Sequence, residues 1–176
     1  MGLPILVSDY RERKILKRFK VTPISSAMIL FVHLAIYTIY SAVSVAVLWI
    51  FAKLFWEFEM RGSYLTFFAG WLLVLMSILS IGMLVGGIAK NSKSASVIAS
   101  ILYFPMLVFS GATVPYEIMP VQMQKVVNIM PLTQGIKILK AATLGTEINN
   151  VLVPIIIMVL IILICVGTAI KFFRWE

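Results

Sequence analysis

Residue types that carry out chemistry are sparse in this sequence. Histidine occurs once, as His33, and cysteine once, as Cys165, so the chain can hold neither an internal disulfide nor a cysteine-based metal site. Carboxylates and histidines do not cluster as acid–base catalysis requires. The phosphate-binding pattern G-x-x-x-x-G-K-[ST] is missing, and the nearest basic stretch, residues 86–90, has the wrong spacing. We therefore expect no catalytic residue, no metal site, no directly bound cofactor and no ATP hydrolysis by this chain.

His33 and Cys165 both lie inside long apolar tracts. A histidine in such a tract either forms a hydrogen bond with a neighbouring helix or contacts a substrate or a proton. Cys165 behaves there as a small hydrophobic residue that faces lipid or another helix. Neither residue indicates a reaction, so function must be sought in the elements around them.

Composition places those elements in a membrane. Of the 176 residues, 61% are hydrophobic and 12% are charged, whereas a soluble domain has about a quarter charged. The formal net charge of +8 is compatible with nucleic acid or with an anionic membrane surface. Because the basic residues form small clusters between long uncharged tracts, we expect membrane lipids as partners and no nucleic acid.

Tracts without Lys, Arg, Asp or Glu reach the length of about 20 residues that a helix needs to cross a bilayer. Lipid offers backbone groups no water, and period-2 alternation is lacking, so each tract should be a helix. The predicted fold is all-α, a polytopic membrane helix bundle. Its four predicted spans are residues 27–52, 64–89, 94–116 and 148–170.

Charge placement sets the predicted orientation. Lys and Arg are frequent before the first span, between the second and third at Lys90 and Lys93, and after the fourth at Lys171 and Arg174. Basic loops stay in the cytoplasm, so we expect a multi-pass cell-membrane protein with both termini cytoplasmic. No span contains an acidic residue for a coupling ion, so the energy for any pumping should enter from another polypeptide.

The basic segment over residues 9–20 is predicted to be an amphipathic helix at the cytoplasmic surface, with Ile15, Leu16 and Phe19 on its apolar side. One interpretation is attraction to anionic lipid together with the setting of topology. The other is docking of a soluble partner. The candidate docking residues are Arg11, Glu12, Arg13, Lys14, Ile15, Leu16, Lys17, Arg18 and Phe19.

Residues 116–145 contain two short amphipathic pieces separated by Met130 and Pro131. They form either an interfacial cover or a re-entrant lid over a transport path. Gly82 and Gly86 make a G-x-x-x-G pair that suits close helix packing, within one chain or between two copies. Pro105 indicates a static kink or a gate in the third span.

The order of these features resembles a known family. The run from Asp9 to Ser25, which ends in Thr22-Pro23-Ile24-Ser25, is similar to the cytoplasmic segment of ABC type-2 transporter permeases. Several later pairs follow that family's order. They are Phe104-Pro105, Ser110-Gly111, Val114-Pro115, Met119-Pro120 and the run Met130-Pro131-Leu132-Thr133.

The resemblance implies the transmembrane subunit of an exporter for drugs, lipids or other amphipathic molecules. It implies a homodimer or paired permease and a separate ATPase subunit that binds ATP. Residues 9–20 would be the coupling helix seated on that ATPase. The substrate path would include Tyr103, Phe104, Met106, Leu107 and Ser110 of the third span. The re-entrant lid would include Met119, Pro120, Pro131, Leu132 and Thr133.

The family has two helices ahead of the coupling helix, and residues 1–7 look like the end of the second. The expected organisation is a segment over residues 1–26, which joins this end to the coupling helix, and a transmembrane domain over residues 27–176. A non-transport membrane module, such as an immunity or scaffold protein that binds a partner through the basic helix, is the alternative.

Overall fold

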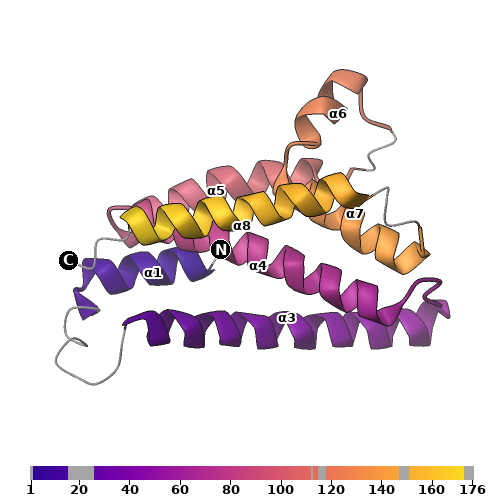
Figure 1. Ribbon diagram of the computed structural model, residues 1–176, viewed down its shortest axis with the longest axis horizontal. Helices are drawn as coiled ribbons and strands as arrows, with labels where there is room; N and C mark the ends of the chain where they lie inside the picture. The colour runs from indigo at the N-terminus through magenta and orange to yellow at the C-terminus, as the bar shows by residue number, and fades with distance from the viewer. Residues whose placement is uncertain (1, 16–25, 112, 115–117, 147–150, 173–176) are drawn as a thin grey trace.

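The computed structural model describes all residues except 1, 16–25, 112, 115–117, 147–150 and 173–176. Within the described part the regular elements are helices, and no strand occurs there. They are α1 (Gly2–Glu12), α3 (Ser26–Trp56), α4 (Tyr64–Ile88), α5 (Ser92–Phe109), α6 (Val121–Val127), α7 (Pro131–Leu144) and α8 (Leu152–Phe172). The long helices run side by side (Figure 1). The predicted all-α bundle is confirmed.

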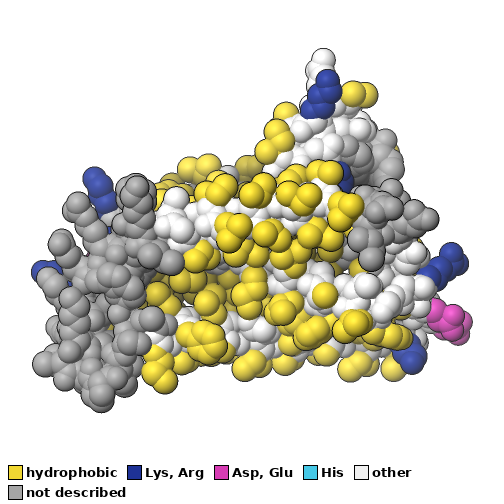
Figure 2. All heavy atoms as spheres, viewed as in Figure 1, with side chains coloured by type: hydrophobic (Ala, Val, Ile, Leu, Met, Phe, Trp, Pro, Cys, Tyr) yellow, Lys and Arg dark blue, Asp and Glu magenta, His cyan; other side chains and the backbone are white. Residues whose placement is uncertain are grey.

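Four of the described helices are long and apolar enough to cross a membrane: 30–56, 64–88, 92–109 and 152–169. Their outward side chains are apolar, as with Leu48, Leu65 and Leu163, which are 68%, 77% and 64% exposed. Figure 2 shows hydrophobic side chains along the length of the visible face, with charged ones at its ends and on the projection that α6 forms. Such a surface is stable in lipid, so this is a multi-pass membrane protein.

Two helix boundaries in the described residues differ from those predicted. The third span ends at Phe109 rather than at residue 116, because the chain turns at Ser110-Gly111, where Gly111 has a φ of 87°. The helix predicted to start at Asp9 starts at Gly2 instead and ends at Glu12. Lys14, with a φ of 53°, sits in the turn that follows. Ile15 is helical again, and residues 16–20 lie outside the described residues.

α1 packs inside the bundle against α4 and α5. Leu3 and Val7, one turn apart, are buried in a core with Leu79 of α4. Gly86 permits this approach, since a Cβ there would lie 2.8 Å from the Pro4 carbonyl oxygen and from Val7 Cβ. The G-x-x-x-G pair is therefore occupied within the chain, by α1.

α4 is the central helix and also packs against α7 and α8. A Cβ at Gly135 of α7 would lie 2.8 Å from Val74 of α4 and 3.0 Å from Met158 of α8. Met158 is fully buried. The predicted pair of short helices separated at Met130 and Pro131 is present as α6 and α7. α7 is an integral part of the bundle, whereas α6 projects away from it (Figure 1).

α3 lies along α4 (Figure 1). An apolar stretch of 18 residues within its candidate span contains no buried residue. Trp71 Nε1 of α4 donates to Ser41 Oγ at 3.0 Å. Further along, the Trp49 ring contacts Tyr64 and Phe67, with centroids 5.6 Å apart in both pairs. α3 is joined to the bundle by these contacts and by Leu30, which lies in the apolar core with Leu3, Val7 and Leu79.

Candidate functional site

The last turn of α1 meets the end of α4. Arg11 Nη1 donates to the carbonyl oxygens of Gly86 and Ala89 at 3.4 and 3.3 Å, and to that of Gly87. The last carbonyls of a helix lack partners within that helix and carry partial negative charge. A guanidinium supplies both donors and charge, so Arg11 neutralises the C-terminal end of α4.

The next residue meets the start of α5. Glu12 Oε2 accepts hydrogen bonds from Ser92 N at 3.0 Å and from Ser92 Oγ at 3.2 Å. Asn91 Oδ1 caps the same helix by accepting from Ser94 N at 2.7 Å. A carboxylate beside a helix N-terminus complements the positive end of that helix. Glu12 therefore binds α5 in the way that Arg11 binds α4.

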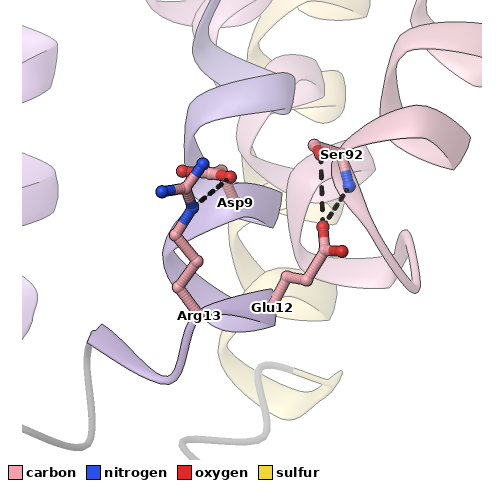
Figure 3. Close-up of polar contacts among 4 residues, drawn as sticks. All are labelled: Asp9, Glu12, Arg13 and Ser92. Carbon is pink, nitrogen blue, oxygen red and sulfur yellow. Dashed lines mark hydrogen bonds and ion pairs between the residues drawn. The ribbon is translucent and has the colours of Figure 1, made fainter.

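Arg13 and Lys14 lie in the turn that follows α1, and both are exposed, as Glu12 is. Arg13 Nε forms an ion pair with Asp9 Oδ1 of α1 at 2.9 Å. Arg13 and Asp9 point away from Ser92 (Figure 3). Of the nine candidate docking residues, Arg11 and Glu12 contact the bundle, whereas Leu16, Lys17, Arg18 and Phe19 lie outside the described residues.

An apolar cavity of about 170 Å³ lies between α1, α4, α5 and the start of α7, and Tyr37 of α3 also lines it. Of the five predicted substrate-path residues, Tyr103 and Met106 line it, and Leu132 of the predicted lid joins them. Leu102 lies on the same wall as Tyr103 and Met106. These positions form one helical stripe along α5. Predicted path and lid residues thus meet at one cavity.

Phe104, Leu107 and Ser110 do not line this cavity. Phe104 is 57% exposed, with its ring 5.9 Å from that of Tyr103. Ser110 is buried, and its Oγ donates to the Leu107 carbonyl oxygen at 3.1 Å. The helical period directs Phe104 to another face than Tyr103. Ser110, four residues after Met106, falls on the same stripe but is the C-cap of α5, beyond the part of the helix that lines the cavity.

Sequence reasoning missed the contribution of α1 to this cavity. Gly2, Leu3 and Pro4 form part of its lining. The available signal was the one-turn spacing of Leu3 and Val7, but the stretch was too short to be taken for a span. Its burial depends on Gly82 and Gly86, which are far away in the sequence.

The remaining predicted lid residues lie around the two short helices. Met119 is buried before α6, and exposed Pro120 precedes the first residue of that helix. Pro131 opens α7, and Thr133 is buried in the bundle. Gln134 Nε2 donates to the Asn128 carbonyl oxygen, which fixes the connection between the helices. The start of α7 is therefore built into the bundle rather than laid over it.

At the other end of α7 the chain makes a tight junction. The backbone N–H groups of Arg61 and Gly62 both donate to the Thr143 carbonyl oxygen at 3.1 Å. Gly145 ends α7 with a φ of 72°, a left-handed conformation that favours glycine. A Cβ at Gly62 would lie 1.8 Å from the Ala142 carbonyl oxygen. The loop between α3 and α4 is thereby held against α7.

His33 forms a hydrogen bond with another helix, as the first interpretation predicted. Tyr10 Oη and His33 Nε2 lie 3.1 Å apart, with ring centroids separated by 5.5 Å. This contact joins α1 to α3. Within the described ranges, no group of three His, Cys, Asp or Glu side chains is placed to hold a metal ion.

Comparison with known proteins gave one result. A family model described as ABC-2 type transporter matches residues 2–144, from α1 through α7. No curated protein matched, and no solved structure matched.

Proposed function

The chain belongs to the ABC-2 type transporter family, and we propose that it is the permease subunit of an exporter driven by a separate ATPase. The family defines a membrane component and not the ATPase itself. ATP would bind only to the partner, in keeping with the missing phosphate-binding pattern in this sequence. The cargo would be drugs, lipids or other amphipathic molecules.

The main support for this proposal comes from the end of the bundle where the last turn of α1 meets the α4–α5 turn, called here the α1 end. Arg11 and Glu12 join α1 to the turn between α4 and α5, and the basic segment continues directly from them. Lys90 and Lys93 are exposed at that turn. Basic residues mark cytoplasmic loops, so this end would face the cytoplasm, with both termini on that side of the cell membrane. A cytoplasmic ATPase would dock there, on the part of residues 9–20 that follows Arg11 and Glu12.

The cavity supports the cargo class. Its walls are mostly apolar, and Tyr103 and Met106 offer an aromatic ring and a flexible thioether. Such side chains adapt to varied apolar shapes. Leu132 adds the start of the predicted lid to the same wall. An amphipathic molecule would bind with its apolar part against this stripe of α5.

A second permease would complete the assembly. The exposed apolar faces of α3 and α5 include Phe31, Tyr40, Ile101 and Phe104. Lipid covers such faces in a single subunit, and part of this surface would pack against the partner permease.

Charge reversal of the docking segment tests the proposal. In vesicles that contain the permease and its ATPase, Arg13→Glu combined with Lys17→Glu should reduce substrate-stimulated ATP hydrolysis about tenfold or more. Insertion into the membrane should not change. Lys125→Glu is the matched control, because Lys125 is exposed on α6, away from the α1 end. Equal stimulation in the double variant and the control would contradict the docking role and favour a module without transport.

A further inference from the structure

Two adjacent residues of α1 hold the ends of two different helices. Arg11 binds the last carbonyls of α4, and Glu12 binds the first residue of α5. We infer that Arg11 and Glu12 are positioning residues that tie the α4–α5 turn to the last turn of α1, so that movement of the docking segment reaches the helix that lines the cavity. The movement itself rests on the proposed function, whereas the tie rests on the contacts alone.

The charges fit their places. Arg11 is a cation at a helix C-terminus and Glu12 an anion at a helix N-terminus, and both arrangements are stabilising. Hydrogen bonds that involve an ionised group are about twice as strong as neutral ones. Arg11 donates to three carbonyl oxygens at the end of α4, and Glu12 accepts from two donors of Ser92. Side chains pointed at a soluble partner would leave these acceptors and donors for water.

Apolar packing next to the tie leaves little room for independent movement. Ala89 and Ala95 flank the α4–α5 turn and are 3% and 0% exposed. Gly86 lies against Val7 and Pro4, with no space for a methyl group between them. A close-packed interior transmits displacement rather than absorbing it. The last turn of α1, the end of α4 and the start of α5 should therefore move together.

Arg13 provides the contrast. It lies two residues after Arg11 and has the same charge, but it forms an ion pair with Asp9 of α1, and its side chain is 69% exposed. Figure 3 shows Glu12 directed at Ser92 while Arg13 is directed at Asp9, on another side of α1. Exposed pairs of this kind contribute little to stability. Removing the charge of Arg13 should leave the α4–α5 turn unchanged.

Backbone hydrogen exchange of the full chain in detergent micelles tests the tie without any ATPase. Arg11→Gln should speed exchange in residues 87–94 about tenfold, because charged hydrogen bonds to the carbonyls at the end of α4 are lost. Glu12→Gln should speed it about three- to fivefold, because Glu12 is exposed and glutamine keeps an acceptor oxygen without the charge. Arg13→Gln should leave these rates within about twofold, the scale of an exposed pair. Arg11→Lys, which keeps the charge but not the fork of donors, should fall between. Unchanged rates in both Arg11→Gln and Glu12→Gln would overturn the tie.

Vesicles that contain permease and ATPase test the movement. Arg11→Gln and Glu12→Gln should retain the ATPase during purification yet lose substrate stimulation of hydrolysis about tenfold, because docking continues without transmission. The charge reversal at Arg13 and Lys17 should instead release the ATPase. Full stimulation in Arg11→Gln and Glu12→Gln would overturn the transmitting role. If the unaltered permease never retained an ATPase, the proposed function would fail. The hydrogen-exchange experiment would still test whether Arg11 and Glu12 hold the α4–α5 turn.

Discussion

Replacing Gly86 by alanine should loosen α1 from the bundle. The added Cβ would lie 2.8 Å from both the Pro4 carbonyl oxygen and Val7 Cβ, where carbon atoms normally approach to about 3.5–4.0 Å. Both contacts lie on or near the α1 backbone, so the helix itself must move by several tenths of an ångström. Overpacking of this kind costs about 1–3 kcal/mol.

Two other glycines serve as controls in the same chain. At Gly82 the nearest atom to an added Cβ is 3.4 Å away, and at Gly167 nothing lies within 4 Å. Gly82→Ala should therefore have a small effect. Gly167→Ala should be neutral or stabilising, by up to about 1 kcal/mol, because alanine favours helix.

Thermal unfolding of the purified chain in detergent measures the series. At about 2–4 °C per kcal/mol for a chain of this size, Gly86→Ala should lower the melting temperature by roughly 2–12 °C. Hydrogen exchange in residues 87–94 should rise as well, because Arg11 would be drawn away from its carbonyls. Equal melting temperatures for Gly86→Ala and Gly167→Ala would refute the packing of α1 on this seam. A loss of dimer without a change in melting temperature would place the seam between copies instead.

The remaining predictions concern the far junction and the cavity. Gly62→Ala should destabilise the chain by more than about 3 kcal/mol, because its Cβ would lie 1.8 Å from a backbone oxygen that cannot rotate away; a variant that melts within about 2 °C of the unaltered chain would contradict this junction. Met106→Ala should raise the substrate concentration needed for half-maximal ATPase stimulation about five- to tenfold through lost apolar contact, whereas Leu107→Ala, one position away and outside the cavity lining, should change it less than twofold. If Met106→Ala and Leu107→Ala raised this concentration equally, the cavity would not be part of the substrate path.

The sequence predicted the membrane helices well because their signal is local. A tract of about 20 apolar residues is a span whatever its neighbours are. The end of the third span was misplaced because apolar residues continue beyond Phe109, and hydropathy does not report the positive φ of Gly111. The break between α6 and α7 at Pro131 was predictable, since proline favours the first turn of a helix.

Contacts between distant residues limited the prediction of the site. Arg11 was expected to contact a partner protein because its sequence neighbours are basic. Its acceptors are instead in the same chain, 75–78 residues further along the sequence. Composition could not distinguish it from exposed Arg13. Tyr103 and Met106 lie on the cavity face of α5, whereas Phe104 and Leu107 do not, and which face of an apolar helix meets a cavity is decided by its packing against α1, α4 and α7.

Transport by the reconstituted pair tests the central claim most directly. Vesicles that contain the permease and its ATPase, loaded with ATP on the side of the α1 end, should move a fluorescent amphipathic dye away from that side. Movement should stop when a non-hydrolysable ATP analogue replaces ATP or when Arg13 and Lys17 are both reversed in charge. Dye movement that is independent of ATP hydrolysis, or absent although the ATPase is bound, would contradict an ATP-driven exporter.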